Sequence, residues 1–247
     1  MSEIEGIYTI WLREVIRFWR DKSRIVSSLV QPLLFLIVLG GGFSFVRFGN
    51  VNYQTFLFPG IVAMSLVGIS IASGVSVIWD REFGFLKEIL VAPISRTSIF
   101  IGKALGGCTT ALIQGIIILS LSFIIGVPIT PNSFLLSIFL MIVISLGLVS
   151  IGLIIASLIE TFESFGMIMN FIIFPLIFLS GAFFPLQEAP EWLKIISFAN
   201  PLTYGVEAIR YTIIGFSSIP FSLSLTIIIA FSLMMILLGG IAFSRQK

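Results

Sequence analysis

The sequence predicts an all-α protein that crosses a membrane several times, and three observations support this. Hydrophobic residues make up 57% of the 247-residue chain, only 11% of its residues are charged, and the mean hydropathy is +1.14. Soluble domains carry about 25% charged residues, so this chain lacks the polar side chains to cover a soluble surface. Six apolar runs are each long enough, at about 20 residues, to span a bilayer as a helix.

Short polar connections mark the ends of the six predicted spans. The second span ends at Trp79, directly before Asp80, and Glu160 and Glu163 separate the fourth span from the fifth. We place the spans at residues 26–47, 56–79, 104–127, 134–158, 165–185 and 221–243. Residues 1–247 are therefore expected to form a single transmembrane domain.

Lysine and arginine are distributed unevenly between the two sides of this predicted bundle. Eleven of the 14 basic residues fall in the N-terminal arm, in the stretch from the end of the second span to the start of the third, and at the C-terminus. Since basic residues are enriched in cytoplasmic loops, both termini are expected in the cytoplasm. We expect the protein in the cell (plasma) membrane, in contact with the lipid bilayer.

The N-terminal arm, residues 1–25, is predicted to hold an amphipathic helix in the inner interface. Its basic residues share one face: Arg13, Arg17, Arg20 and Arg24. This face is expected to lie toward anionic lipid headgroups. The helix then either anchors the first span or also braces a cytoplasmic partner.

Residues 80–98 form the longest charged connection on the predicted inner side. Residues 81–91 within it predict an amphipathic helix with Phe85 and Ile89 on one side, ended by Pro93. A short helix of this kind either rests on lipid or docks into a groove of another protein.

The segment 186–219 is predicted as an outer hairpin. Pro190 to Leu193 predict a short interfacial helix, and residues 201–215 predict another, with Asn200 as N-cap, Pro201 at its first position and Gly215 as its stop. A seventh span is disfavoured, because charges such as Glu207 and Arg210 cost about 2.5–3.5 kcal/mol each at the bilayer centre. We expect a re-entrant or interfacial helix in which these two residues pair.

Few polar side chains occur within the spans. Gln31, Gln114 and Asn170 either line a transport pathway or hydrogen-bond between helices. Lys103 is expected near the inner interface, with its ammonium group extended to water. The spans carry no chain of carboxylates typical of proton-coupled carriers, which favours an apolar or amphipathic cargo and an outside energy source.

Composition excludes several classes of function. The chain has no histidine, which excludes His-based catalytic triads and HExxH metal sites, and its single cysteine, Cys108, excludes a disulfide within the chain. A net charge of +2 gives no support for a nucleic-acid partner. No GxxxxGK(S/T) motif occurs, so no nucleotide site is expected on this chain. We expect no other cofactor and no metal on it either. An intramembrane enzyme is the least favoured class.

Two motif blocks of this chain resemble the permease subunits of ABC-2 type transporters. The blocks are DREFGFLKEILVAPISRTSIFIGK and, later, FFPLQEAPEWLKIISFANPLTYGVEAIR. The family includes daunorubicin-resistance and nodulation-factor permeases, which export drugs, lipids and lipid-linked saccharides. The resemblance implies a non-enzymatic subunit driven by separate ATPases that hold ATP and Mg²⁺. It further implies two ATPase copies and a second permease chain, either identical or a paralogue.

The resemblance also implies roles for individual residues. It assigns contact with the ATPase to Arg81, Glu82, Phe85, Lys87 and Glu88. It assigns the outer hairpin or gate to Asn200, Pro201, Tyr204, Glu207 and Arg210. An ATP-independent channel or secondary carrier remains the alternative function.

Overall fold

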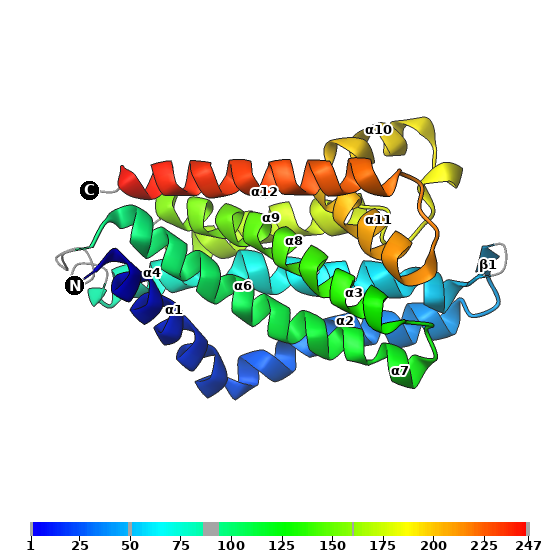
Figure 1. The fold of residues 1–247 in the computed structure, drawn as a ribbon, viewed down its shortest axis with the longest axis horizontal. Helices are drawn as coiled ribbons and strands as arrows, with labels where there is room; N and C mark the ends of the chain where they lie inside the picture. The colour runs from blue at the N-terminus through cyan, green and yellow to red at the C-terminus, as the bar shows by residue number, and fades with distance from the viewer. Residues whose placement is uncertain (1, 49–50, 86–93, 160, 246–247) are drawn as a thin grey trace.

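The computed structural model describes residues 2–48, 51–85, 94–159 and 161–245, and these are almost entirely helical (Figure 1). The helices are α1 (Glu3–Arg20), α2 (Lys22–Gly42), α3 (Tyr53–Ala72), α4 (Val75–Glu82), α6 (Arg96–Ser120), α7 (Ser122–Ile125), α8 (Pro131–Leu158), α9 (Phe162–Phe178), α10 (Glu191–Ala199), α11 (Pro201–Ile214) and α12 (Phe221–Ser244), with a 3-10 turn at Leu186–Glu188. Two short strands, β1 (Arg47–Phe48) and β2 (Val51–Asn52), form an antiparallel pair.

Within the described part of the chain, five helical stretches are long and apolar enough to cross a membrane. They are Lys22–Gly42, Tyr53–Glu82, Arg96–Ile125, Pro131–Leu158 and Phe221–Ser244. They coincide with five of the six predicted spans, so the prediction of a polytopic all-α membrane protein is confirmed. A further apolar helix, α9, has 17 residues. At 1.5 Å per residue it is about 26 Å long, slightly shorter than a bilayer core of about 30 Å.

The predicted fifth span, 165–185, is wrong at its C-terminal end. Helix α9 ends at Phe178, and Gly181 follows with φ +70°. A left-handed backbone conformation of this kind suits glycine and turns the chain away from the helix axis. The residues that follow therefore lead into α10 instead of extending the span.

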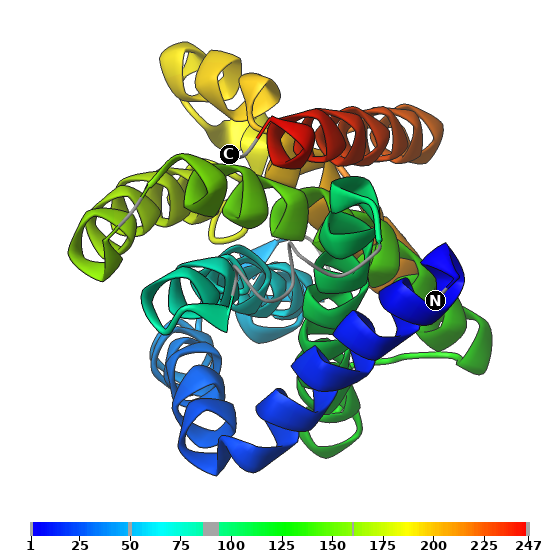
Figure 2. The ribbon, with the colours of Figure 1, turned by 90° about the vertical axis from the view of Figure 1, so that its left-hand side faces the viewer.

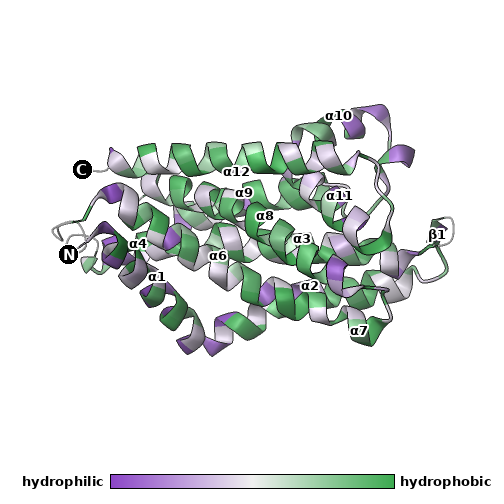
Figure 3. Cartoon of the chain, viewed as in Figure 1, coloured by the Kyte–Doolittle hydropathy of each residue, from purple (hydrophilic) through white to green (hydrophobic). Residues whose placement is uncertain are grey.

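Both termini lie at the same end of the bundle, which we call the termini end (Figures 1 and 2). The end of α4 and the start of α6 lie there too, whereas the β1–β2 pair, α7 and α10 lie at the opposite end (Figure 1). Hydrophobic residues cover the long helices, and hydrophilic residues gather at the two ends and along α1 (Figure 3). This distribution matches a protein whose middle section contacts lipid.

Helix α3 forms the centre of the core. It is apolar on all sides, and every residue from Phe56 to Val67 is buried. Helices α2, α6, α8 and α11 pack around it. A helix that is hydrophobic on all sides is stable only when surrounded by apolar neighbours or lipid, which explains why this segment occupies the centre.

The chain between α3 and α4 lies in direct backbone contact with α8. A Cβ atom placed on Gly74 would lie 2.2 Å from the carbonyl oxygen of Gly152 in α8, and a Cβ on Gly152 would lie 2.2 Å from that of Ile71. Because neither glycine has a side chain, the two backbones touch directly. The predicted second span is accordingly interrupted here, since α3 ends at Ala72 and α4 begins at Val75.

Two predictions for the termini end are wrong. The helix predicted over 81–91 is interrupted in its described part, because Arg81 and Glu82 end α4 and Gly84 adopts φ +77°, and residues 86–91 lie outside the described residues. The basic face of α1 does not point to lipid headgroups as a whole. Helix α1 ends at Arg20, Arg24 belongs to α2, and Arg13 turns inward to a buried carboxylate.

Candidate functional site

Four charged side chains from three helices meet near the termini end, and we call them the charge cluster: Arg13, Glu14, Asp80 and Lys103. The carboxylate of Asp80, in α4, is buried and accepts hydrogen bonds from Arg13 Nη1 at 3.0 Å and from Lys103 Nζ at 2.5 Å. Lys103 also donates to Glu14 Oε1 and to Ser76 Oγ, both at 3.2 Å. The cluster therefore connects α1, α4 and α6.

Charge balance explains how this cluster is stable away from water. Two carboxylates face two cations, and the side chain of Lys103 has 0% exposure. A buried ammonium group needs such partners, because desolvation of an unpaired charge is very costly. The prediction that Lys103 extends to water is therefore wrong. The hydrogen bond with Asp80 also raises the pKa of Arg13, so its guanidinium stays charged.

Two glycines of α6 let α1 dock closely enough to complete the cluster. A Cβ on Gly102 would lie 2.8 Å from the Cβ of Ile10, and a Cβ on Gly106 would lie 2.6 Å from that of Glu14. Next to this contact, Trp11 Nε1 donates to the hydroxyl of Thr109 at 3.0 Å. The small residues therefore place α1 directly against α6.

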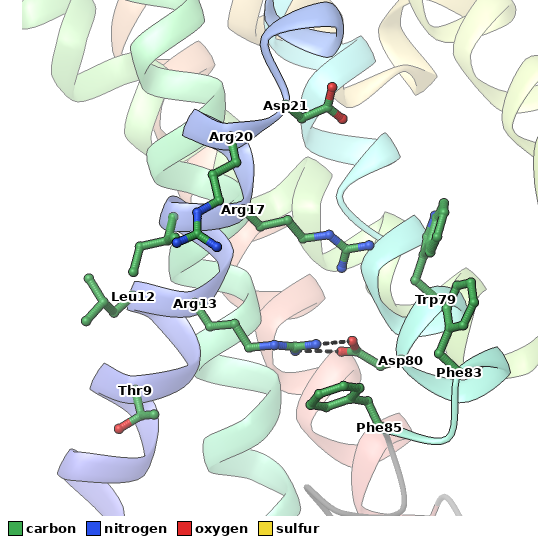
Figure 4. Close-up of a pocket in the computed structure, with 11 residues that line it drawn as sticks. Thr9, Leu12, Arg13, Arg17, Arg20, Asp21, Trp79, Asp80, Phe83 and Phe85 are labelled. Atoms are coloured by element: carbon green, nitrogen blue, oxygen red, sulfur yellow. Dashed lines mark hydrogen bonds and ion pairs between the residues drawn. The ribbon is translucent and has the colours of Figure 1, made fainter.

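A cleft of about 1240 Å³ lies beside the cluster, between α1 and α4 (Figure 4). We call it the basic cleft, and its main lining residues are Arg13, Arg17, Arg20, Trp79, Phe83 and Phe85. The guanidinium of Arg13 lies 5.2 Å from the ring centroid of Phe85, and that of Arg17 lies 5.4 Å from that of Trp79. Among the described residues, Arg17 and Arg20 have no carboxylate within 4 Å. The cleft thus offers two cations beside an aromatic wall.

A second charged site lies within α11. Glu207 and Arg210 form a fully buried ion pair, as predicted from their i,i+3 spacing. Arg210 Nη2 donates to the carbonyl of Gly181 at 2.7 Å, and its guanidinium lies 4.2 Å from the ring centroid of Phe56 in α3. Glu207 also accepts from the backbone N–H of Ser218. These contacts hold α11 among α3, α8 and α12.

The start of α11 confirms the sequence-based assignment of its cap. The side chain of Asn200 accepts from the N–H of Leu202 at 2.9 Å and donates to the carbonyl of Leu176 at 2.8 Å, and Pro201 opens the helix. Tyr204 donates its hydroxyl to the carbonyl of Phe198 at 2.8 Å. The bonds to Leu176 and Phe198 join the start of α11 to α9 and α10, which is a structural role.

Comparison with known proteins decides the family. The sequence model described as ABC-2 type transporter matches residues 5–214. The chain belongs to the ABC-2 type transporter family. It is 34% identical to ycf38 of Cyanophora paradoxa, named a transport permease, over 84% of this chain and 74% of that protein. It is 27% identical to the inner membrane transport permease YadH of Escherichia coli, over 92% and 90% of the two chains.

A third relative is YbhR of Escherichia coli, whose name describes a multidrug ABC transporter permease. The identity is 33%, over 63% of this chain and 42% of YbhR. The chain is therefore a membrane permease of an ABC transporter, a class of subunit that typically works with a separate ATPase.

The predicted coupling residues of the permease lie in different surroundings. Arg81 donates from Nη1 to the carbonyl of Ile159 at 2.6 Å, at the end of α8, and Glu82 is exposed. Phe85 is half-exposed and lines the basic cleft. Lys87 and Glu88 lie outside the described residues.

Two of the three predicted pathway residues of the permease come together. Gln31 and Gln114 line a cavity of about 240 Å³ among α2, α3, α6 and α9, which we call the polar recess. Its other lining residues include Arg24, Ser65 and Gly68. Asn170 lies on an exposed face of α9 and does not line this recess.

Sequence reasoning missed the charge cluster of the permease. From the sequence, Asp80 is only the residue that follows the second span, and Glu14 is only one of the residues of the N-terminal arm. One signal was available: Asp80 and Lys103 are both charged residues beside apolar runs, and such residues usually pair. The spacing of Gly102 and Gly106 permits close approach of a helix, but nothing in the sequence identifies α1 as the helix that docks there.

Proposed function

We propose that this permease is the membrane subunit of an ATP-driven exporter. Two ATPase subunits and a second permease chain, identical or a paralogue, complete the transporter, with six spans per permease and both termini cytoplasmic in the plasma membrane. The cargo is a hydrophobic or amphipathic compound such as a drug, a lipid or a lipid-linked saccharide. ATP and Mg²⁺ bind the partner ATPases, and this chain holds neither.

One observation carries the proposal: the base of segment 80–98 is bonded to three helices. Asp80 binds Arg13 of α1 and Lys103 of α6, and Arg81 binds the end of α8 through Ile159. A force applied to the segment by a closing ATPase would reach these helices together. Charged hydrogen bonds suit this task, because they are short, directional and about twice as strong as neutral ones.

The basic cleft is the proposed seat of the ATPase. Arg17 and Arg20 present cations with no carboxylate of the described residues within 4 Å, and Trp79 and Phe85 present apolar surface beside them. An acidic, amphipathic segment of the ATPase would complement both the arginines and the aromatic side chains of the cleft. The name of YbhR as a multidrug permease supports a drug-like cargo.

The test is purification of the tagged permease from native membranes, followed by assays of ATP hydrolysis and export in vesicles. We expect a stoichiometric ATPase to copurify. Phe85→Asp should abolish coupled export while membrane insertion survives, because Phe85 forms part of the cleft wall. Phe45→Asp is the matched control, since Phe45 is 78% exposed and precedes the β1–β2 pair at the opposite end.

The alternative, an ATP-independent channel or secondary carrier, predicts the opposite result. Export by the purified permease alone, in vesicles without any ATPase, would overturn the proposal. So would full coupled export by Phe85→Asp.

A further inference from the structure

A polar stripe runs along one face of α2. Arg24, Ser27, Ser28 and Gln31 follow the spacing i, i+3, i+4 and i+7, and all four line the polar recess. Residues at this spacing lie on one face of a helix. The rest of α2 up to Gly42 is almost entirely apolar, so the stripe has no role in contact with lipid tails.

The wall of the recess opposite the polar stripe is formed by α3, and it has free space at Gly68. Gly68 of α3 is exposed, although the residues on either side of it are buried. A Cβ atom placed on Gly68 would meet no other atom within 4 Å. The central helix of the core therefore leaves free space at this one turn, facing the polar stripe.

Gln114, a residue of the recess wall, carries a buried acceptor without a partner among the described residues. It is 2% exposed, and its Nε2 donates to the carbonyl of Ser28 at 2.8 Å. Only the amide nitrogen can donate to a carbonyl, so this bond fixes the orientation of the side chain. Its Oε1 has no hydrogen-bond partner among the described residues. A buried acceptor left without a partner costs free energy, which a hydroxyl or amide donor from a ligand would recover.

Arg24 supplies a cation at the edge of the recess. It is half-buried, and no carboxylate of the described residues lies within 4 Å of its guanidinium. It has one long hydrogen bond, from Nη2 to the carbonyl of Ala72 at 3.4 Å. A partly desolvated guanidinium with spare donors is suited to phosphate, to which arginine binds with paired hydrogen bonds.

We propose that the polar recess binds the anionic head of an amphipathic cargo. Arg24 binds the phosphate. Gln114 accepts a hydrogen bond from a hydroxyl group on the alcohol that is esterified to this phosphate. The inference rests on the proposed function as an exporter of amphipathic compounds, and it names the class of head that this permease takes: a phosphate ester carrying a hydroxyl group.

The size of the recess supports a head group and excludes a whole cargo molecule. Drug-sized ligands occupy pockets of about 300–1,000 Å³, whereas the recess has about 240 Å³. Exposed apolar side chains lie close to it, with Leu34 one turn beyond Gln31 on α2 and Phe174 on α9 beside the lining residue Ile173. The hydrocarbon tail would lie over these residues.

Binding to the purified permease in maltoside micelles tests the site, with radiolabelled dodecyl phosphate and dodecyl phosphoglycerol as probes in equilibrium dialysis. Arg24→Gln should weaken the binding of both probes roughly tenfold to hundredfold, the usual effect of losing a charged hydrogen bond. Arg24→Lys should retain part of the affinity. Gln114→Leu should remove the preference for dodecyl phosphoglycerol over dodecyl phosphate.

A second variant keeps the test valid if Arg24→Gln fails to fold. Gly68→Leu should fill the free space and abolish binding, although it leaves every polar group in place. Arg47→Gln and Gly166→Leu are the matched controls and should bind like wild type, since Arg47 is an exposed arginine of β1 that lines neither the recess nor the basic cleft. Gly166 is an exposed glycine of α9 with open space around it that does not line the recess. Wild-type binding by Arg24→Gln and Gly68→Leu would overturn the proposal.

The same head chemistry occurs in resident lipids, and a second assay separates the two sources. In the complex with its ATPase, dodecyl phosphoglycerol should stimulate ATP hydrolysis, and Arg24→Gln should need at least tenfold more probe. Binding that depends on Arg24 without any change in stimulation would mean a resident lipid and would overturn the assignment to cargo. Since the dialysis assay contains no ATPase, its outcome is independent of whether the proposed function holds.

Discussion

The charge cluster is partly buried and the ion pair of α11 is fully buried, and the two are assembled in different ways. The cluster joins residues as far apart in sequence as Arg13 and Lys103, whereas Glu207 and Arg210 are one helical turn apart. The cluster also borders the basic cleft, and the α11 pair is enclosed by protein. A long-range cluster can transmit movement between helices, while a local pair mainly secures one helix among its neighbours.

The strongest test of this contrast is Asp80→Ala. It leaves the buried Lys103 and the half-buried Arg13 with Glu14 as their shared ionic partner, at 3.2 Å and 3.8 Å. Loss of one partner of a buried ion pair costs about 3–5 kcal/mol, so we expect a decrease of that size in the free energy of unfolding, measured by SDS titration in mixed micelles. The double variant Asp80→Ala/Lys103→Met should recover part of it. Unchanged stability of the single variant would contradict the cluster's structural role.

Glu207→Gln should cost no more than Asp80→Ala, at the lower end of about 3–5 kcal/mol, because Arg210 stays buried without a counter-charge. The amide retains an acceptor for Arg210, which also keeps the carbonyl of Gly181 and the ring of Phe56. The same SDS titration measures the loss, with Glu191→Gln, an exposed residue of α10, as control. We expect copurification of the ATPase to be unaffected, because α11 is distant from the termini end (Figure 1). If the ATPase no longer copurified with Glu207→Gln, the charge cluster and the α11 ion pair would not differ in function.

Arg81→Met distinguishes an effect on fold stability from an effect on the transmission of movement between the ATPase and the helices. The half-buried Arg81 loses its hydrogen bond to Ile159, which should cost about 1 kcal/mol. We expect ATP hydrolysis by the complex to continue while export falls, since α8 is no longer bonded to the base of the segment. Parallel measurement of the two rates checks this. Equal loss of both rates would point to misfolding instead.

The smallest expected effect concerns the start of α1. Hydrogen bonds from the Ser98 side chain and from the N–H of Ser95 lower the pKa of Glu3. The contact therefore stabilises the fold above the unfolded pKa of about 4.3 and is lost as pH falls below it, toward the lower folded pKa. Between pH 6 and pH 3, wild type should lose slightly more thermal stability than Glu3→Gln. An equal loss would show that the contact does not contribute.

Local patterns predicted the local site well. The cap at Asn200, Pro201 at the start of α11, the stop at Gly215 and the pairing of Glu207 with Arg210 all depend on residues within one helix. Five of the six spans follow from the length of their apolar runs. These features require only neighbours in sequence, so periodicity and capping preferences are sufficient to find them.

Features that depend on tertiary contact were missed or misplaced. The basic face of α1 was expected toward lipid, because an amphipathic helix next to a span usually lies in the interface. Docking on Gly102 and Gly106 instead brings Glu14 beside Lys103. Hydropathy also cannot detect the interruptions at Gly74 and Gly84, since a window average hardly changes at a single glycine.

Helix α3 and its exit turn should show a sharp gradient in tolerance to mutation. At Gly68 a new side chain meets open space, whereas six residues later, at Gly74, a single methyl group would collide with the backbone of α8. A deep mutational scan read out as folded protein should therefore accept leucine at the first position and reject even alanine at the second. Read out as transport, the same scan should make position 68 intolerant as well. Two glycines less than two turns apart would then be constrained for different reasons, one by assembly of the bundle and one by passage of cargo.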